Sequence, residues 1–248
     1  MPTATLALDE AVDLARTGDI WLFRGRTPAD RAIQLATNSP VNHVGMAVVV
    51  GDLPPLMWHA ELGRSLPDVW SGRRQRGVQL HVLADAVTTW ANRYGQRAWV
   101  RQLSPEVTPA MEDAVLRVIA RLDGTPFPST VSLASRWLTG RLPSVRRPGG
   151  RAGGDGEDAG GGRGGGGRGG GGGGGAAGLE TAYCAEVLAV TYQAMSLLPG
   201  GRRPGWYDAG RFWSGDDLRL DGGYSLGGEL AVRVPPAAPG ASDVTSHH

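Results

Sequence analysis

Apolar residues occur along the chain in short runs that turn residues separate. The runs contain many β-branched or aromatic side chains and stop at glycine, proline or aspartate, which is typical of strands. Because Gly51–Pro55 is rich in turn residues, the runs on either side of it are predicted to form an antiparallel hairpin. The predicted strands cover residues 20–25, 43–50, 56–61, 78–83 and 98–103, with shorter candidates over 217–220 and 229–234.

Other stretches repeat apolar residues at the spacing of a helix. The clearest covers residues 108–122, where Thr108 suits the N-cap and Pro109 suits the first helical position. Strands joined by short turns and mixed with helices indicate an α+β fold with an antiparallel sheet. Further helices are predicted over 4–16, 27–37, 84–93 and 129–138, and from Cys184 to Leu198.

One segment differs in kind from the rest. Residues 149–178 hold 20 of the 40 glycines and no aromatic or branched apolar side chain. Such a segment buries too little surface to offset the entropy of ordering it. We therefore predict a disordered polyglycine insert over 148–178 within a single domain made of residues 1–147 and 179–234. A disordered tail is predicted over 235–248.

Composition and charge exclude several classes of protein. The chain has 248 residues, 41% of them hydrophobic, and a net charge of +1, which favours no nucleic-acid partner. Only two arginines interrupt the main polyglycine run and no aromatics are interleaved with it, so RNA binding of the arginine-glycine type is disfavoured. The acidic N-terminus is unlike a signal peptide, and no apolar run is long enough to span a bilayer. We expect a cytoplasmic protein without an integral membrane segment.

The single cysteine, Cys184, is the first candidate for chemistry. It opens the predicted apolar helix that ends at Leu198. A thiol in the first turn of a helix lies near the positive end of the macrodipole, which favours the nucleophilic thiolate. The alternative is a buried structural cysteine that behaves as a small hydrophobic residue.

Histidines on the predicted strands supply candidate bases. His43 opens one strand, and His59 and Glu61 are two residues apart on the next, so that their side chains share a face. Either could orient the His43 ring, as a catalytic triad requires. For His43 the alternative is a structural histidine at the edge of the core. For His59 and Glu61 the alternative is that their shared face is solvated. His81 is interpreted as structural. No close metal-ligand spacing is present, so neither a metal nor another cofactor is expected.

Four stretches together resemble the NlpC/P60 superfamily in its circularly permuted, papain-like form. Residues 18–23 (GDIWLF) resemble its opening strand, and residues 39–46 (SPVNHVGM) resemble its S-x-x-x-HVG block. Residues 122–127 (LDGTPF) resemble its L-G-x-P-Y turn, and residues 183–187 (YCAEV) resemble its Y-C-S-E-L block. The histidine precedes the cysteine, as in the permuted order. The likeness is closest to the YiiX/YaeF-like amidases and more distant to lecithin retinol acyltransferase.

The resemblance implies an antiparallel sheet packed on a helix that starts with a nucleophilic cysteine. Cys184 would be the nucleophile, His43 the base, and Tyr183 a contributor to the oxyanion or substrate site. YiiX-like proteins use a glutamate as third member and the acyltransferase relatives a histidine. Both His59 and Glu61 therefore remain candidates, with His59 ranked first.

The expected activity is that of a cysteine hydrolase of the amidase or peptidase type. Its substrate would be a small-molecule, peptide or lipid amide or ester, cleaved through an acyl-enzyme. One alternative is lipid acyltransferase or thioesterase activity at the same site. The other is a non-catalytic binding module with the same fold.

Overall fold

A seven-stranded sheet forms the centre of the computed structural model. The structure describes residues 5–26, 31, 39–61, 63–126 and 173–237, with the backbone alone at 173–182 and 216. The strand order is β1-β9-β6-β2-β3-β4-β5, and β7 and β8 form a separate two-stranded sheet. The strands are β1 (Thr5–Ala7), β2 (Ile20–Arg24), β3 (His43–Val48), β4 (Leu56–Glu61), β5 (Gly77–Val82), β6 (Arg97–Arg101), β7 (Leu103–Ser104), β8 (Ser225–Leu226) and β9 (Leu230–Arg233).

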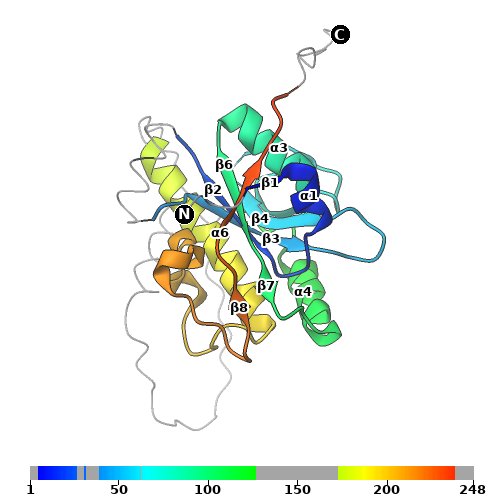
Figure 1. Ribbon diagram of the computed structural model, residues 1–248, viewed down its shortest axis with the longest axis vertical. Coiled ribbons are helices and arrows are strands. Elements are labelled where there is room, and N and C mark those ends of the chain that lie inside the picture. The colour runs from blue at the N-terminus through cyan, green and yellow to red at the C-terminus, as the bar shows by residue number, and fades with distance from the viewer. Residues whose placement is uncertain (1–4, 27–30, 32–38, 62, 127–172, 238–248) are drawn as a thin grey trace, which may run out of the picture.

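The pairing in the central sheet is mostly antiparallel. Strands β2, β3, β4 and β5 run as consecutive antiparallel neighbours, and β6 pairs with β2 on the other side. The exception is the edge pair β1 and β9, which is parallel and brings the two ends of the described chain together (Figure 1). The architecture is therefore α+β.

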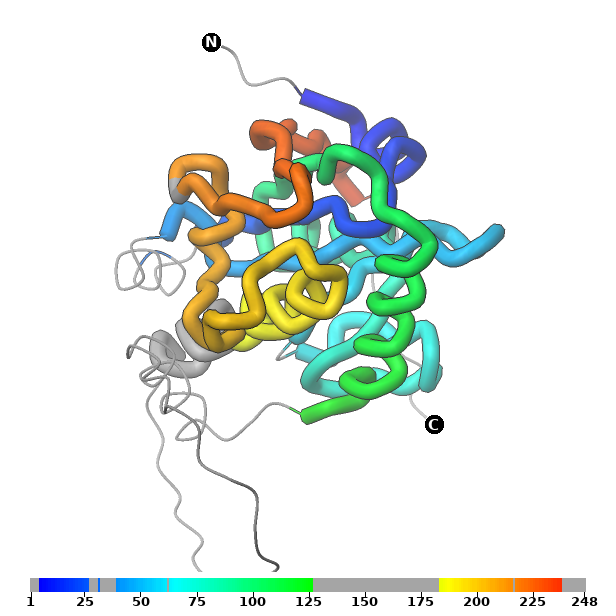
Figure 2. The backbone as a smooth tube through the Cα atoms, turned by 90° about the horizontal axis from the view of Figure 1, so that it is seen from below, coloured from blue at the N-terminus to red at the C-terminus, as the bar shows by residue number. Residues whose placement is uncertain are grey.

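Helices cover both faces of this sheet. Helices α4 and α6 pack on one face and lie side by side in Figure 2, α4 in green and α6 in yellow. Helices α1 and α3 pack on the other face. The helices are α1 (Leu8–Asp13), α3 (Leu83–Tyr94), α4 (Pro109–Leu122) and α6 (Gly173–Ala194), with short 3₁₀ turns η1 (Pro204–Trp206), η2 (Ala209–Phe212) and η3 (Ser214–Asp216).

Alternation along the strands divides the core into two layers, because successive side chains of a strand point to opposite faces. On β3, Val44 and Met46 point into the layer shared with α4 and α6, which we call the α6 layer. Ala47 of β3 and Phe23 of β2 point into the layer shared with α1 and α3, which we call the α3 layer.

A buried hydrogen bond fixes α6 on the sheet. The indole Nε1 of Trp58, on β4, donates to Oγ1 of Thr191 at 3.1 Å. The Thr191 hydroxyl in turn donates to the carbonyl oxygen of Val187 at 2.9 Å. Since both side chains are fully buried, this bond sets where α6 lies along β4.

Most of the predicted strands are confirmed. Those over 20–25, 43–50, 56–61 and 78–83 are β2 to β5, the predicted hairpin is the β3–β4 pair, and the segment 98–103 is divided between β6 and β7. The predicted strand over 229–234 is β9, but that over 217–220 is wrong because no strand forms there.

The helix predictions have a similar outcome. The helix over 108–122 is α4, with Thr108 accepting a hydrogen bond from the Met111 backbone N–H as its N-cap. Instead of one helix over 4–16, the chain forms the edge strand β1 and then α1. The predicted helices over 27–37 and 129–138 lie almost entirely outside the described residues.

The glycine-rich segment is mostly outside the described residues as well. Within 148–178, the structure describes only 173–178, whose backbone forms the start of α6. No helix in the described part of the chain is both long enough and apolar enough to cross a bilayer.

Candidate active site

Three histidines step diagonally across neighbouring strands of the sheet. His43 is the first residue of β3, His59 lies on β4 and His81 lies on β5. In the β4–β5 register His59 faces Gln79 and His81 faces Met57, so the two histidines are diagonal neighbours. All three side chains point into the α3 layer, where their rings meet.

The ring nitrogens of the three histidines form a chain of contacts. Nε2 of His43 lies 3.2 Å from Nδ1 of His59, and Nε2 of His59 lies 3.1 Å from Nδ1 of His81. A neutral imidazole carries one N–H donor and one acceptor nitrogen. His59 can therefore donate to one neighbour and accept from the other.

An aromatic side chain from α3 covers this chain of rings. The ring of Trp90 meets His43 and His59 edge to face, with centroids 4.8 and 4.7 Å apart. Phe23 of β2 packs on His43 with a centroid distance of 5.7 Å. These contacts limit rotation of the two imidazoles and hold their nitrogens in register.

Burial keeps the three imidazoles uncharged. It lowers the pKa of His43 to about 3 and that of His81 to about 4, and it holds the pKa of His59 well below its ordinary value. For His43 and His59 the neighbouring histidines act in the same direction, because one protonated imidazole would lie beside another. For His81 the Asp68 carboxylate opposes the shift in pKa and Arg74 adds to it. At neutral pH each ring therefore keeps a lone pair for accepting a proton or binding an ion.

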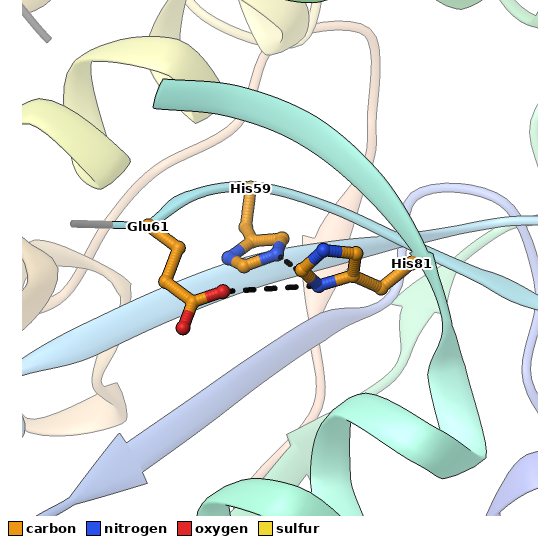
Figure 3. A group of neighbouring side chains, drawn as sticks. All are labelled: His59, Glu61 and His81. Carbon is orange, nitrogen blue, oxygen red and sulfur yellow. Dashed lines mark hydrogen bonds and ion pairs between the residues drawn. The ribbon is translucent and has the colours of Figure 1, made fainter. Parts of the chain in front are cut away.

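Glu61 lies in the same layer, at the other end of the chain of contacts. Its Oε2 lies 4.0 Å from Nδ1 of His81 and accepts a hydrogen bond from Oγ of Ser65 at 3.0 Å. Burial raises the pKa of the Glu61 carboxyl. Figure 3 shows the carboxylate pointing toward His81.

The two candidates for the third catalytic member thus differ in their partners. His59 contacts His43 directly, whereas Glu61 contacts His81. The alternative of a solvated face is wrong, because His59 and Glu61 are both buried. Sequence reasoning missed the contact of His81 with His59. Polar residues Gln79 and His81 alternating on an otherwise apolar strand were the available indication.

Cys184 and Tyr183 lie in the other layer. Cys184 is fully buried in the α6 layer, together with Val44 and Trp58. Since successive residues of β3 point to opposite faces, His43 points away from the layer that holds Val44 and Cys184. The structure therefore brings His43, His59, His81 and Glu61 together but does not bring Cys184 to the His43 ring.

The predicted start of the cysteine helix is wrong. Helix α6 begins at Gly173, so Cys184 lies eleven residues inside it. In a helix interior, a backbone N–H is bonded to the carbonyl four residues earlier. Neither the macrodipole at a helix start nor a free backbone N–H is therefore available to Cys184 in this arrangement.

No protein-family model matches the chain, and no curated protein matches it. Among solved structures, the chain is similar to the metalloprotein YiiX of Escherichia coli O157:H7, with 23% sequence identity and a TM-score of 0.35. The match covers 47% of this chain and 54% of that chain. That structure is of the YiiX type, but similarity at this level transfers neither a function nor a residue's role.

Proposed function

We propose that this chain is a cysteine hydrolase of the amidase or peptidase type, of the YiiX/YaeF-like kind within the NlpC/P60 superfamily. His43 is the general base, His59 the residue that orients it, and Cys184 the nucleophile. The observation that carries the proposal is the 3.2 Å contact between Nε2 of His43 and Nδ1 of His59. A base held by a third group is the arrangement that activates a nucleophile in triads.

In this proposal the reacting nitrogen of His43 is the one that does not contact His59. With Nε2 engaged, the nitrogen that exchanges protons with the reacting groups is Nδ1, which has no hydrogen-bond partner in the described part of the chain. Nδ1 takes the thiol proton of Cys184 while Sγ bonds to the substrate carbonyl carbon. The electron pair of the carbonyl double bond moves to its oxygen, and a tetrahedral intermediate forms.

Collapse of the intermediate breaks the bond to the leaving nitrogen or oxygen, which receives the proton from Nδ1 of His43. The remaining acyl group is a thioester on Cys184. A water molecule then gives its proton to Nδ1 and attacks the thioester carbonyl. The carboxylic acid leaves, and Sγ regains the proton from His43.

This mechanism requires α6 to bring the Cys184 side chain to the His43 ring. Sγ of Cys184 must reach Nδ1 of His43 at the start of β3, whereas the described structure has the two side chains in different layers. Tyr183, beside the nucleophile, remains the proposed contributor to substrate or oxyanion binding. In this proposal Glu61 influences the His43 base only indirectly, through His81 and His59.

The reactivity of Cys184 tests the proposal directly. Cys184 is the only cysteine, so alkylation by iodoacetamide near pH 7 reports on it alone, and Cys184→Ala gives the blank. The unfolded chain supplies the rate of an ordinary thiol, whose pKa is about 8.5. We expect the folded protein to react faster than the unfolded chain, and His43→Gln to remove that difference.

A second measurement separates catalysis from reactivity. Incubation with p-nitrophenyl esters should leave an acyl thioester on Cys184, detectable by mass spectrometry and absent in Cys184→Ala. A folded protein in which Cys184 reacts more slowly than in the unfolded chain, regardless of His43, contradicts the mechanism. That result favours the non-catalytic binding module. Transfer of the acyl group to an added amine or alcohol indicates acyltransferase activity.

A further inference from the structure

A second kind of site lies at the other end of the histidine chain. Nε2 of His59, Nδ1 of His81 and a carboxylate oxygen of Glu61 all lie within 4.8 Å of one another. The two imidazole nitrogens are 3.1 Å apart, and Nδ1 of His81 is 4.0 Å from Oε2 of Glu61. Figure 3 shows the three side chains converging from the neighbouring strands β4 and β5.

These separations are close to those expected for ligands of one ion. Zinc binds imidazole nitrogen and carboxylate oxygen at about 2.0–2.2 Å, which puts tetrahedral ligand atoms about 3.3–3.6 Å apart. The separation of 3.1 Å lies just below that range and that of 4.0 Å above it, so Oε2 of Glu61 must move toward Nδ1 of His81 to bind the same ion. Two histidines and one carboxylate also match a known ligand set for zinc, which leaves further positions for water or substrate.

The surroundings of Glu61 favour a cation. Its side chain is buried, and within the described residues Arg93 acts on it electrostatically without forming an ion pair. A carboxylate buried without a positive partner is costly. A divalent ion bound by His59 and His81 would place a positive charge in direct contact with Oε2, which Arg93 does not.

Two neighbouring residues, His43 and Gln79, are placed to support the ligands of the ion without binding the ion themselves. Metal-ligating histidines usually engage their second ring nitrogen in a hydrogen bond that fixes the ring. His59 has this arrangement, because its Nδ1 contacts Nε2 of His43. Gln79 faces His59 in the strand register, and both its amide atoms are buried without a hydrogen-bond partner in the described part of the chain. Water bound to an ion would give that amide a partner.

We propose that His59, Glu61 and His81 bind a divalent first-row transition-metal ion such as Zn²⁺, with His43 and Gln79 in the outer shell. This proposal departs from the expectation, drawn from the sequence, that the chain has no metal site. It uses neither Cys184 nor its reactivity, but it shares His43 and His59 with the cysteine mechanism. An ion on Nε2 of His59 leaves the His59 proton on Nδ1, which donates to Nε2 of His43 and keeps the His43 proton on Nδ1. Proton transfer to Nδ1 of His43 therefore belongs to the ion-free state.

Metal uptake by the full-length protein without a polyhistidine tag tests this proposal. After dialysis against a chelator, the protein should bind one equivalent of Zn²⁺, and Tm should rise by roughly 5 °C or more at saturating Zn²⁺. With Co²⁺ the visible spectrum should show the bands of nitrogen and oxygen ligands and lack a thiolate-to-cobalt charge-transfer band. These measurements use the wild-type chain, so they hold even if a ligand variant fails to fold.

Variants then identify the ligands. His81→Gln and Glu61→Gln should weaken Zn²⁺ binding by more than about 100-fold, and the outer-shell variant His43→Gln by about 10-fold. Cys184→Ala is the matched control, since it removes a buried residue of the α6 layer and should leave Zn²⁺ affinity unchanged. The remaining histidines, His247 and His248, are replaced together by glutamine in the full chain.

Several results overturn the proposal. One is a wild-type chain that neither retains Zn²⁺ nor gains Tm when it is added. Others are loss of binding in the His247→Gln, His248→Gln double variant, a thiolate band with Co²⁺, or a folded His81→Gln protein that binds Zn²⁺ as tightly as wild type. Cys184→Ala abolishes the proposed hydrolase activity but not metal binding, so failure of one proposal is distinguishable from failure of the other.

Discussion

Nε2 of His43 lies 3.2 Å from Nδ1 of His59 on the neighbouring strand. This contact fixes the His43 ring on one side, and in the proposed mechanism Nδ1 is the nitrogen that transfers protons. It also engages the second nitrogen of His59, whose Nε2 contacts His81. One residue, His59, thus joins the proposed catalytic base to the proposed metal ligands.

The contact predicts that His59 acts on Cys184 reactivity through His43. His59→Ala removes one hydrogen bond to the base, worth roughly 0.5–1.5 kcal/mol, so the alkylation rate of Cys184 should fall about 2- to 10-fold. His59→Gln retains a donor and an acceptor and should lose less. The readout is the alkylation rate across a pH range, because a positioning role changes the pH profile while a packing defect lowers the rate at every pH. Equal rate profiles for His59→Ala and wild type contradict the prediction.

The Trp58–Thr191 hydrogen bond predicts a loss of stability in a near-isosteric variant. Thr191→Val leaves the buried indole N–H of Trp58 without its acceptor, which should lower the free energy of unfolding by about 1–3 kcal/mol. Thr191→Ser keeps the oxygen and should lose less. Urea unfolding followed by tryptophan fluorescence measures both. A Thr191→Val protein as stable as wild type argues against this bond as the anchor of α6.

At Gly77, the first residue of β5, adding a single methyl group should strongly destabilise the folded protein. Its φ is +119°, and a Cβ there would lie 2.1 Å from the carbonyl oxygen of Thr125. Backbone strain and this overlap together should cost about 2–5 kcal/mol in Gly77→Ala. Gly51 is the matched control: its φ is +52°, and nothing lies within 4 Å of a Cβ there. Gly51→Ala should cost about 1–2 kcal/mol. Equal losses in thermal unfolding contradict the overlap.

Replacing Asp123, the C-cap of α4, by a neutral residue should stabilise the folded protein at high pH. Burial, together with the nearby Asp68 carboxylate, raises its pKa to about 6 from an ordinary value of 3.8. The folded state therefore binds more protons than the unfolded state between these values, and stability falls as pH rises through this window. Asp123→Asn removes the charge that forms above pH 6. Its Tm should exceed that of wild type at pH 8, and the difference should shrink toward pH 4. A difference that is independent of pH contradicts this origin.

Much of the fold follows from local patterns in the sequence. The strands β2 to β5 and helix α4 coincide closely with apolar runs and capping residues that neighbours along the chain supply. The hairpin β3–β4 follows from the turn residues between its strands, because the chain reverses where glycine and proline allow it. Helix α6 begins before the predicted start at Cys184, since nothing local distinguishes the first turn of a helix from a later one at Tyr183 and Cys184.

Local sequence likewise predicts one part of the candidate site and leaves the other part undetermined. Period-two alternation was sufficient to place His59 and Glu61 on one face, and both lie there. The meeting of His43, His59 and His81 depends on the register between three strands. Local sequence does not encode that register, because cross-strand packing of residues distant in the chain selects it.

The sequence by itself determined which residues bear reactive groups, which segments are strands, and which side chains share a face of a strand. Only the tertiary structure decided which faces meet. It joined three histidines and a glutamate in the α3 layer, and it buried Cys184 in the α6 layer. The physical reason is that periodicity sets the direction of a side chain along its own element, whereas packing between elements sets what that side chain touches.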